Sequence, residues 1–325
     1  MEKSRATYNG LGHTLNFKIS NFKFQILVRE ILVKSILNKK KKRDSWFLDD
    51  YTLNPYEGCS FNCQYCYIRG SKYGENMADA LSVKINGADV LDRQLAFRVK
   101  KEQYGMIALA SATDPYIRQE EKYRMTERLL GLIHKHHFPV LIITKSDLIT
   151  RDFSILKEID ANARHADDLK DKLNRGVVLS FSFSTLDEDI AATLEPGAPS
   201  PKKRLETMKR CKDEGFLVGM NCIPSLPFIS DTDEQLDKLV RAGKEAGADY
   251  ALIGGLTLFG NQSADSKTLY YKFLERKFPH LVSDYKKLYR IFFYPPKNYI
   301  DDLNKRADMI CDRYAIRRSI IEKNT

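Results

Sequence analysis

A loop with three closely spaced cysteines constrains this chain more than any other feature. Cys59, Cys63 and Cys66 are four and then three residues apart, and the next cysteine along the chain is Cys211. Thiolates are soft ligands suited to zinc or to an iron–sulfur cluster. A closed zinc site takes four ligands, so three thiolates favour a four-iron cluster with one iron left for a small molecule. A zinc loop, a ferredoxin-like cluster and unrelated core cysteines are the alternatives.

The remaining cysteines and the hydropathy of the chain indicate the cellular compartment of the protein. Cys211, Cys222 and Cys311 are scattered, so the six cysteines do not resemble a secreted disulfide framework. The N-terminus has no signal-peptide core, and the longest apolar stretch, 22–37, is broken by Lys and Arg before it reaches the length of a membrane span. We therefore expect a cytoplasmic protein with no membrane partner.

The charge of the chain is basic. There are 53 Lys and Arg against 43 Asp and Glu, a net charge of +10, which favours a polyanionic partner such as DNA or RNA. Half of this excess comes from the run Lys39–Arg43. Such a run is also typical of a solvated, flexible segment.

Short apolar runs alternate with amphipathic segments after the cysteine loop. Near-continuous apolar strands between helices indicate parallel strands buried on both faces, and the carboxyl ends of such strands collect the chemistry. With a strand at 51–53, we count six strand–helix units, and Ser200 is expected to cap a helix that begins at Pro201. The predicted strands are 106–111, 139–144, 177–183, 216–223 and 250–253, and the predicted helices are 84–99, 119–136, 152–159, 201–214 and 233–246.

The C-terminal part has a different pattern. Helices are predicted at 268–277, 281–289 and 301–314, with tyrosines and phenylalanines among lysines. Aromatic side chains among basic ones can stack nucleic-acid bases, or they can pack helices against the edge of a barrel. We predict a basic N-terminal extension over 1–45, a core over 46–256 and a C-terminal helical extension over 257–325.

The cysteine spacing, with Tyr65 directly before the last cysteine, resembles the signature of the radical SAM superfamily. Further segments resemble the branch of that superfamily related to spore photoproduct lyase, whose members are often labelled DNA-repair photolyase-like. The resemblance covers roughly residues 31–255. The segments that carry it are Lys34–Leu37, Asn54–Tyr56, Ser111–Tyr116, Thr144–Ser146 and Leu194–Pro199.

The resemblance implies an α/β fold, an open six-stranded (β/α)6 partial TIM barrel, with the cluster loop after the first strand. It implies a 4Fe–4S cluster on Cys59, Cys63 and Cys66 whose open iron binds S-adenosylmethionine (SAM). One electron then breaks a carbon–sulfur bond, and the 5′-deoxyadenosyl radical abstracts hydrogen from the substrate. The expected partners are SAM, a reductase or a flavodoxin- or ferredoxin-type electron donor, and DNA or RNA.

We expect a lyase-like DNA-repair reaction on a damaged or modified base. Radical chemistry on a peptide or small molecule is the alternative within enzymes. A non-catalytic iron–sulfur protein that binds nucleic acid is the alternative outside them.

The resemblance also assigns residues to the cofactor. SAM carries an ammonium that needs acceptors and a carboxylate that needs a cation. The expected cofactor-binding residues are Ser111, Thr113 and Asp114 for the ammonium, Lys145 for the carboxylate, Ser182 or Ser184 for ribose or carboxylate, and Tyr65 in the loop. Asp114, which precedes a proline, is also a common turn former, and Glu195, Arg204 and Asn221 are further candidates for the pocket.

The resemblance fails at one place. Spore photoproduct lyase carries a cysteine just before the polar segment after its second strand, and this cysteine returns a hydrogen atom to the repaired thymine. Here Ser111 and Ala112 occupy that place, and neither an O–H bond nor a methyl group replaces a weak S–H bond. Cys222, at the end of the predicted fifth strand, is the candidate for this catalytic role, with an ordinary buried core cysteine as the alternative.

Overall fold

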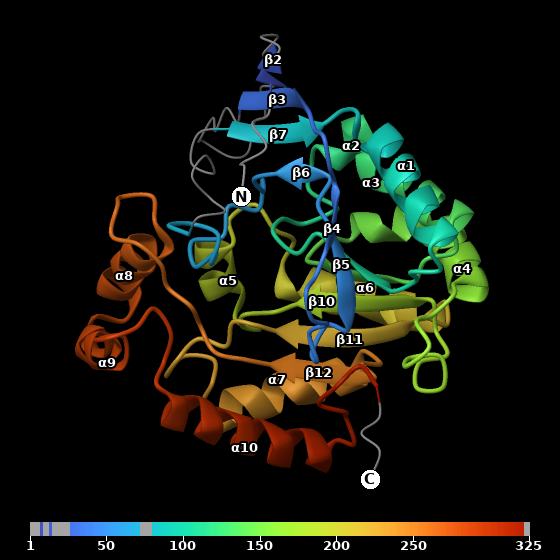
Figure 1. The fold of residues 1–325 in the computed structure, drawn as a ribbon. Helices are drawn as coiled ribbons and strands as arrows, with labels where there is room; N and C mark the ends of the chain where they lie inside the picture. Colours follow the sequence, from blue (N-terminus) through green and yellow to red (C-terminus); the bar gives the residue numbers. More distant parts are fainter. Residues whose placement is uncertain (1–6, 9–12, 15–26, 72–79, 322–325) are drawn as a thin grey trace. The chain divides into compact units, whose positions relative to one another are not determined.

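The computed structural model describes residues 7–8, 13–14, 27–71 and 80–321 (Figure 1). Contacts divide the chain into two compact units. Unit 1 comprises 1–60, 76–143 and 151–177, and unit 2 comprises 61–75, 144–150 and 178–325. Much of the predicted N-terminal extension lies outside the described residues. Among the helices of the described residues, none combines the length and the apolar character needed to cross a bilayer.

One group of paired strands in unit 1 is mainly parallel. β5 pairs with β8 and β8 with β9, all parallel, and β4 is antiparallel to β5. Helices lie between and after these strands in the chain, and α3 contacts both α1 and α4. The elements are β4 (Leu37–Lys39), β5 (Asp49–Leu53), β8 (Met106–Leu109), β9 (Val140–Thr144), α1 (Gly87–Lys100), α2 (Glu120–Tyr123), α3 (Met125–Lys135), a short helix Leu148–Asp152 and α4 (Phe153–Asn162).

A second sheet in unit 1 was not expected from the sequence. β3 is parallel to β7, while β6 is antiparallel to β7 and β1 and β2 are antiparallel to β3. Its strands are only two to six residues long, and β3 and β7 are separated by the whole cysteine loop, so local periodicity did not reveal them. The strands are β1 (Thr7–Tyr8), β2 (His13–Thr14), β3 (Leu27–Leu32), β6 (Tyr56–Glu57) and β7 (Ala80–Lys84).

Unit 2 contains three parallel strands in its described residues, with β11 between β10 and β12. Figure 1 shows α7 and α10 side by side below β12, and both the α7–α10 and the α10–β12 pairs are in contact. The elements are β10 (Val177–Ser182), β11 (Leu217–Cys222), β12 (Tyr250–Ile253), α5 (Glu188–Leu194), α6 (Pro201–Asp213), α7 (Asp233–Glu245), α8 (Ser266–Lys277), a short helix Pro279–Leu281, α9 (Val282–Leu288) and α10 (Lys297–Arg313).

Most predicted elements are confirmed. The five strands predicted after the cysteine loop begin and end within two residues of β8 to β12, and the three C-terminal helices correspond to α8, α9 and α10. Ser200 caps α6, and its side chain accepts a hydrogen bond from the amide of Lys203. The α/β class with parallel strands is therefore confirmed in each unit, whereas the barrel of six strands and the boundaries at 45 and 256 stay predictions.

The helix predicted over 119–136 is wrong in one respect, because it is broken at Arg124. This residue has a left-handed φ of 45° and separates α2 from α3. The cause is Glu120, whose carboxylate accepts from the amides of Thr126 and Glu127 at 2.9 and 3.3 Å. A buried side chain thus caps the start of α3, where backbone N–H groups have no partner within the helix.

Candidate functional site

The cysteine loop is tied down by hydrogen bonds of its own. All six cysteines lie in the described part of the chain, and none of them forms a disulfide bond. Cys59, Cys63 and Cys66 are partly exposed. Arg69, nearly buried, donates from Nε to the carbonyl of Cys63 at 3.1 Å and also bonds the side chain of Asn62 and the carbonyl of Ala264. One guanidinium therefore holds the loop at Asn62 and Cys63.

A buried ion pair anchors the same loop in unit 2. The Glu195 carboxylate accepts from the Tyr65 hydroxyl, from Ser184 Oγ at 2.7 Å and from the Arg204 guanidinium. Arg204 also donates to the carbonyl of Ser182 at 3.0 Å. Glu195 and Arg204 are each 1% exposed. Buried charges persist when they are paired and hydrogen-bonded, and here the pair holds the residue that lies between two cysteines.

The positive charge of Lys145 acts on both the cysteine loop and the buried Glu195–Arg204 pair. Burial opposes ionisation of Glu195, but the charges of Arg204 and Lys145 and the hydrogen bonds outweigh it and leave the pKa of Glu195 below its usual value. Burial raises the pKa of Cys66, and the charges of Lys145 and Arg69 oppose this rise. Unit 2 thus brings together four predicted site residues, which are Cys66, Tyr65, Lys145 and Ser184.

The polar segment after β8 contacts the residues just before Cys59 in unit 1. The amide of Ala112 donates to Asn54 Oδ1 at 2.9 Å, and Asn54 Nδ2 donates to Ser111 Oγ at 3.4 Å. Thr113 Oγ1 donates to the carbonyl of Gly58 at 2.6 Å. Two of the residues predicted for the SAM ammonium therefore lie against the chain that leads into the cysteine loop.

The third of these residues, Asp114, forms a turn. Its Oδ1 accepts from the amide of Tyr116 at 2.9 Å, and the side chain is buried, as the Asp-Pro sequence predicts. Ala110, the residue directly after β8, has a left-handed φ of 66°. Strained backbone of this kind is common where side chains are held for function.

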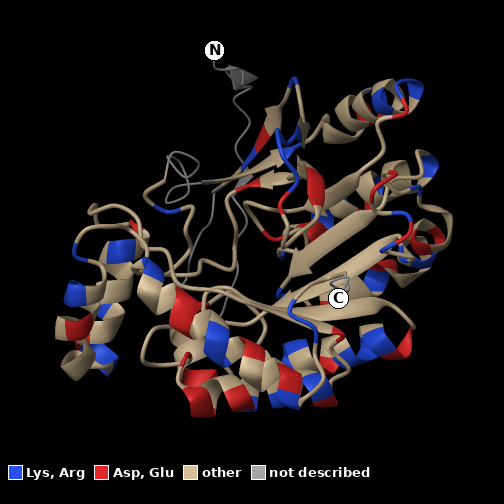
Figure 2. Cartoon of the chain, turned by 60° about the horizontal axis from the view of Figure 1, so that its bottom comes forward, with Lys and Arg blue, Asp and Glu red and all other residues tan. Residues whose placement is uncertain are grey.

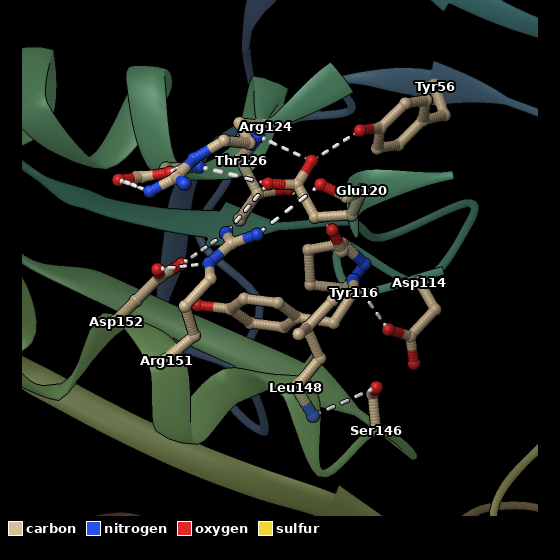
Figure 3. Close-up of polar contacts among 12 residues, drawn as sticks. Tyr56, Asp114, Tyr116, Glu120, Arg124, Thr126, Ser146, Leu148, Arg151 and Asp152 are labelled. Atoms are coloured by element: carbon tan, nitrogen blue, oxygen red, sulfur yellow. Dashed lines mark hydrogen bonds and ion pairs between the residues drawn. The ribbon is translucent and has the colours of Figure 1, made fainter. Parts of the chain in front are cut away.

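A charged network centred on Glu120 lies behind this turn (Figure 3). Fully buried Glu120 accepts from the Tyr56 hydroxyl and from Arg151 Nη2, the latter at 2.8 Å, and Arg151 also bonds Asp152 at 2.7 Å. Burial and the Glu120 charge raise the pKa of Tyr56 well above its usual value, so this hydroxyl is a permanent donor. Sequence reasoning missed Glu120 and Arg151, because nothing in the local pattern marks two residues 31 positions apart as partners.

Replacing Tyr56 by phenylalanine is expected to lower the free energy of unfolding by about 1–3 kcal/mol, because a buried charged acceptor loses its donor. Tyr51 is a matched control, since it is equally buried but donates to a neutral carbonyl, that of Gln103, at 2.8 Å. Tyr51→Phe should cost about 1 kcal/mol. Urea unfolding of both variants checks this prediction, and an equal cost for the two would contradict it.

Cys222 lies at the end of β11, where it is fully buried. Met220, two residues earlier, has its sulfur directly against Gly243 of α7. Since alternate residues of a strand share a face, Cys222 faces this helical layer, and Cys311 of α10 contributes to raising its pKa, after burial as the main cause. The structure therefore gives Cys222 core surroundings, and its catalytic role stays a prediction.

The donors suit an iron–sulfur cluster better than a zinc ion. Three thiols on one short loop, with the cations Lys145 and Arg69 acting on Cys66, match a site for an anionic, thiolate-rich group. Among the described residues, no group of three or more His, Cys, Asp or Glu side chains is arranged as a metal site. The chemistry of the donor set fits, while the arrangement around a metal is not formed in this structure.

Several relatives match the chain in sequence. An uncharacterized protein of Mycobacterium tuberculosis is 30% identical over 272 residues, which cover 82% of this chain and 75% of the relative. An uncharacterized protein of Methanocaldococcus jannaschii is 25% identical over 187 residues, which cover 56% of this chain and 63% of the relative.

Solved structures match the fold. Spore photoproduct lyase complexed with a dinucleoside spore photoproduct has a TM-score of 0.61 at 13% identity, covering 88% of this chain and 79% of that one. A mutant of that lyase with bound SAM and the same dinucleoside has a TM-score of 0.56 at 16% identity, covering 85% and 78%. At this identity the likeness concerns the fold, and it agrees with the resemblance read from the motifs.

The family model of the radical SAM superfamily matches residues 53–243. The match begins in β5 and runs through the cysteine loop to α7. The chain therefore belongs to the radical SAM superfamily, with a fold related to that of spore photoproduct lyase.

Proposed function

We propose that this protein is a radical SAM enzyme that holds a 4Fe–4S cluster on Cys59, Cys63 and Cys66 and reductively cleaves SAM. Membership of the superfamily supports this proposal. One observation supports the choice of these three cysteines. Tyr65, between Cys63 and Cys66, is bonded to the buried Glu195, and the Lys145 charge acts on both Cys66 and Glu195. When bound, the cluster and SAM supply an electron and a 5′-deoxyadenosyl radical that abstracts hydrogen from substrate.

The residues of the chain would bind and orient the cofactor. Lys145, a compact cation at the end of β9, would bind the SAM carboxylate. Ser111, Thr113 and Asp114 would accept from the ammonium. Ser182 would reach ribose or carboxylate. Ser184 and Tyr65 donate to Glu195, so we assign them to orienting the loop as well as to the cofactor pocket.

The proposed substrate is a damaged or modified base in a nucleic acid. The basic net charge of +10 supports a polyanion, and the similar spore photoproduct lyase structure contains a dinucleoside lesion. The reaction differs from that of the lyase, because Ser111 and Ala112 stand where that enzyme has its hydrogen-donating cysteine. This departure favours another lesion, with a peptide or small molecule as the second candidate. A reductase or a flavodoxin- or ferredoxin-type protein would supply the electron, in the cytoplasm.

The test is formation of 5′-deoxyadenosine by anaerobically reconstituted protein with SAM and a strong reductant. Parallel reactions contain no addition, undamaged DNA, or DNA irradiated to carry spore photoproduct. We expect deoxyadenosine in all three, with more in the presence of nucleic acid. No deoxyadenosine from protein with an assembled cluster would refute the assignment. Formation unaffected by either DNA would keep the radical SAM chemistry and turn the substrate search toward other molecules, with a peptide or small molecule first.

A further inference from the structure

Four consecutive large apolar residues are exposed in unit 2, between α9 and α10. Ile291, Phe292, Phe293 and Tyr294 are 72, 53, 46 and 43% exposed, and we call this segment the aromatic ridge. Single exposed apolar residues are ordinary, but a contiguous exposed patch marks a binding surface. Of the two alternatives given for the aromatic residues of this region, packing applies to Tyr285 and Tyr289, which are buried, whereas the ridge residues stay exposed by 43% or more.

The aromatic ridge is fixed in place. The carbonyl of Phe293 accepts from the amide of Leu258 at 2.8 Å, and the Phe293 ring stacks on Phe259 with centroids 4.4 Å apart. Leu258 and Phe259 belong to the segment that follows the carboxyl end of β12, the edge at which parallel α/β proteins bind ligands. The rings of Phe292 and Tyr294 are nearly parallel, at 14°. Rigid rings bind at a small cost in conformational entropy.

The stretch of chain that includes the ridge has a strongly positive net charge. Residues 266–297 contain eight Lys or Arg against two Asp or Glu, a net charge of +6 out of the total of +10. Figure 2 shows Lys and Arg along α8 and α9, at the left of the view. Lys286 and Arg290, close to the ridge in sequence, are exposed. Positive charge is therefore concentrated close to the exposed rings in the sequence, as well as in the run 39–43.

We propose that the aromatic ridge and its basic flank bind single-stranded nucleic acid, with bases stacked on Phe292 and Tyr294 and phosphates bound by Lys286 and Arg290. Rings beside cations are the arrangement by which proteins bind single strands without reading their sequence. A second copy of this chain is a poorer occupant, because its own stretch 266–297 with a net charge of +6 would repel the same stretch here. A neutral apolar partner would make no use of the positive charge. The inference deepens the proposed function by naming its partner, yet strand binding needs neither SAM nor an electron.

Anisotropy of a fluorescein-labelled 20-nucleotide oligo-dT, titrated with the cluster-free full chain at several salt concentrations, tests this proposal. Phe292→Ala/Tyr294→Ala should weaken binding about tenfold or more, since each stacked base contributes on the order of a tenfold factor. Lys286→Ala/Arg290→Ala should reduce the slope of log affinity against log salt by roughly 1.4, because each phosphate contact to a single strand contributes about 0.7. Circular dichroism verifies that each variant is folded.

The chain offers matched controls for both changes. Phe97 on α1 is 50% exposed, with the Lys101 ammonium 4.6 Å from its ring centre, so Phe97→Ala removes an exposed ring beside a cation elsewhere. Lys41→Ala/Lys42→Ala removes two exposed cations from the N-terminal run. Neither control should change the affinity more than about twofold, within the scatter of surface substitutions.

Several results would overturn the inference. The first is that the wild-type protein does not bind the oligonucleotide at low salt, or that it binds a matched duplex more tightly. The second is that the ridge variant binds like the wild type, or that Phe97→Ala loses as much affinity as the ridge variant. The third is that the protein is a dimer which the ridge variant abolishes. Deoxyadenosine formation without strand binding would overturn this inference alone. Strand binding without SAM cleavage would overturn the proposed function and leave the ridge as a nucleic-acid surface.

Discussion

Replacement of Cys63 by alanine is expected to abolish 5′-deoxyadenosine formation while the chain stays folded. Mutating groups that merely orient metal ligands already costs about 10–100-fold, so losing a ligand should cost more than about a hundredfold. The fold should survive, since Cys63 is partly exposed and Arg69 bonds its carbonyl rather than its thiol. Chromatography of the reaction, the iron content and the electron paramagnetic resonance signal of the reduced cluster measure the effect.

Cys211 provides the matched control for this experiment. It is fully buried on α6, and burial raises the pKa of its thiol to about 12, so it is inert as a metal ligand. Cys211→Ala should retain iron, the spectroscopic signal and activity. Retained activity in Cys63→Ala, or equal loss in both variants, would refute the cluster assignment. Global unfolding of Cys63→Ala would favour a structural metal site instead.

Replacement of Glu195 by glutamine is expected to destabilise the protein by about 3–5 kcal/mol. The change leaves the Arg204 guanidinium buried without its counter-charge, and removing one partner of a buried pair costs this much. Lys209→Ala on the same helix, α6, is the control, because Lys209 and its partner Asp213 are both 61% exposed and such pairs contribute at most about 1 kcal/mol. Urea unfolding compares them, and similar losses would contradict the prediction.

The same pair predicts a dependence on pH. Because the pKa of Glu195 in the folded protein lies below its usual value of 4.5, its ionised form stabilises the fold above that pH, and this contribution is lost as the pH falls through the lower folded value. Wild-type protein should therefore lose stability on acidification below about 4.5. Glu195→Gln should lose less over the same range. Parallel unfolding curves at each pH would refute the sign of this shift.

The sequence predicted what depends on local pattern. The apolar run of β8 is buried throughout and that of β9 is buried except for the partly exposed Ile143. Ser200 before Pro201 is a local capping signal, so strands and caps were found near their observed places. Lys145 and Ser184 were assigned to the cofactor pocket by the family resemblance, and their places after two predicted strands agree with the rule that the carboxyl ends of parallel strands collect the chemistry.

The sequence did not predict what depends on distant partners. The break at Arg124 follows from Glu120, whose carboxylate caps α3 and binds Arg151. The sheet of β3, β6 and β7 pairs segments on either side of the cysteine loop. For Cys222 the apolar pattern predicts the strand but not the face on which the side chain lies, and the contact of Met220 with Gly243 identifies that face. Such pairings are determined by tertiary packing, which local periodicity does not encode.

The hydrogen bonds of Arg69 affect what happens to the cysteine loop when the protein is exposed to oxygen. Its guanidinium holds the carbonyl of Cys63, the side chain of Asn62 and the carbonyl of Ala264, so this part of the loop keeps its shape without iron. Many small metal-binding domains unfold when the metal leaves, because binding supplies their folding energy. We therefore expect that loss of the proposed cluster to oxygen would leave this part of the loop folded, so that iron and sulfide could be supplied again without refolding of the chain.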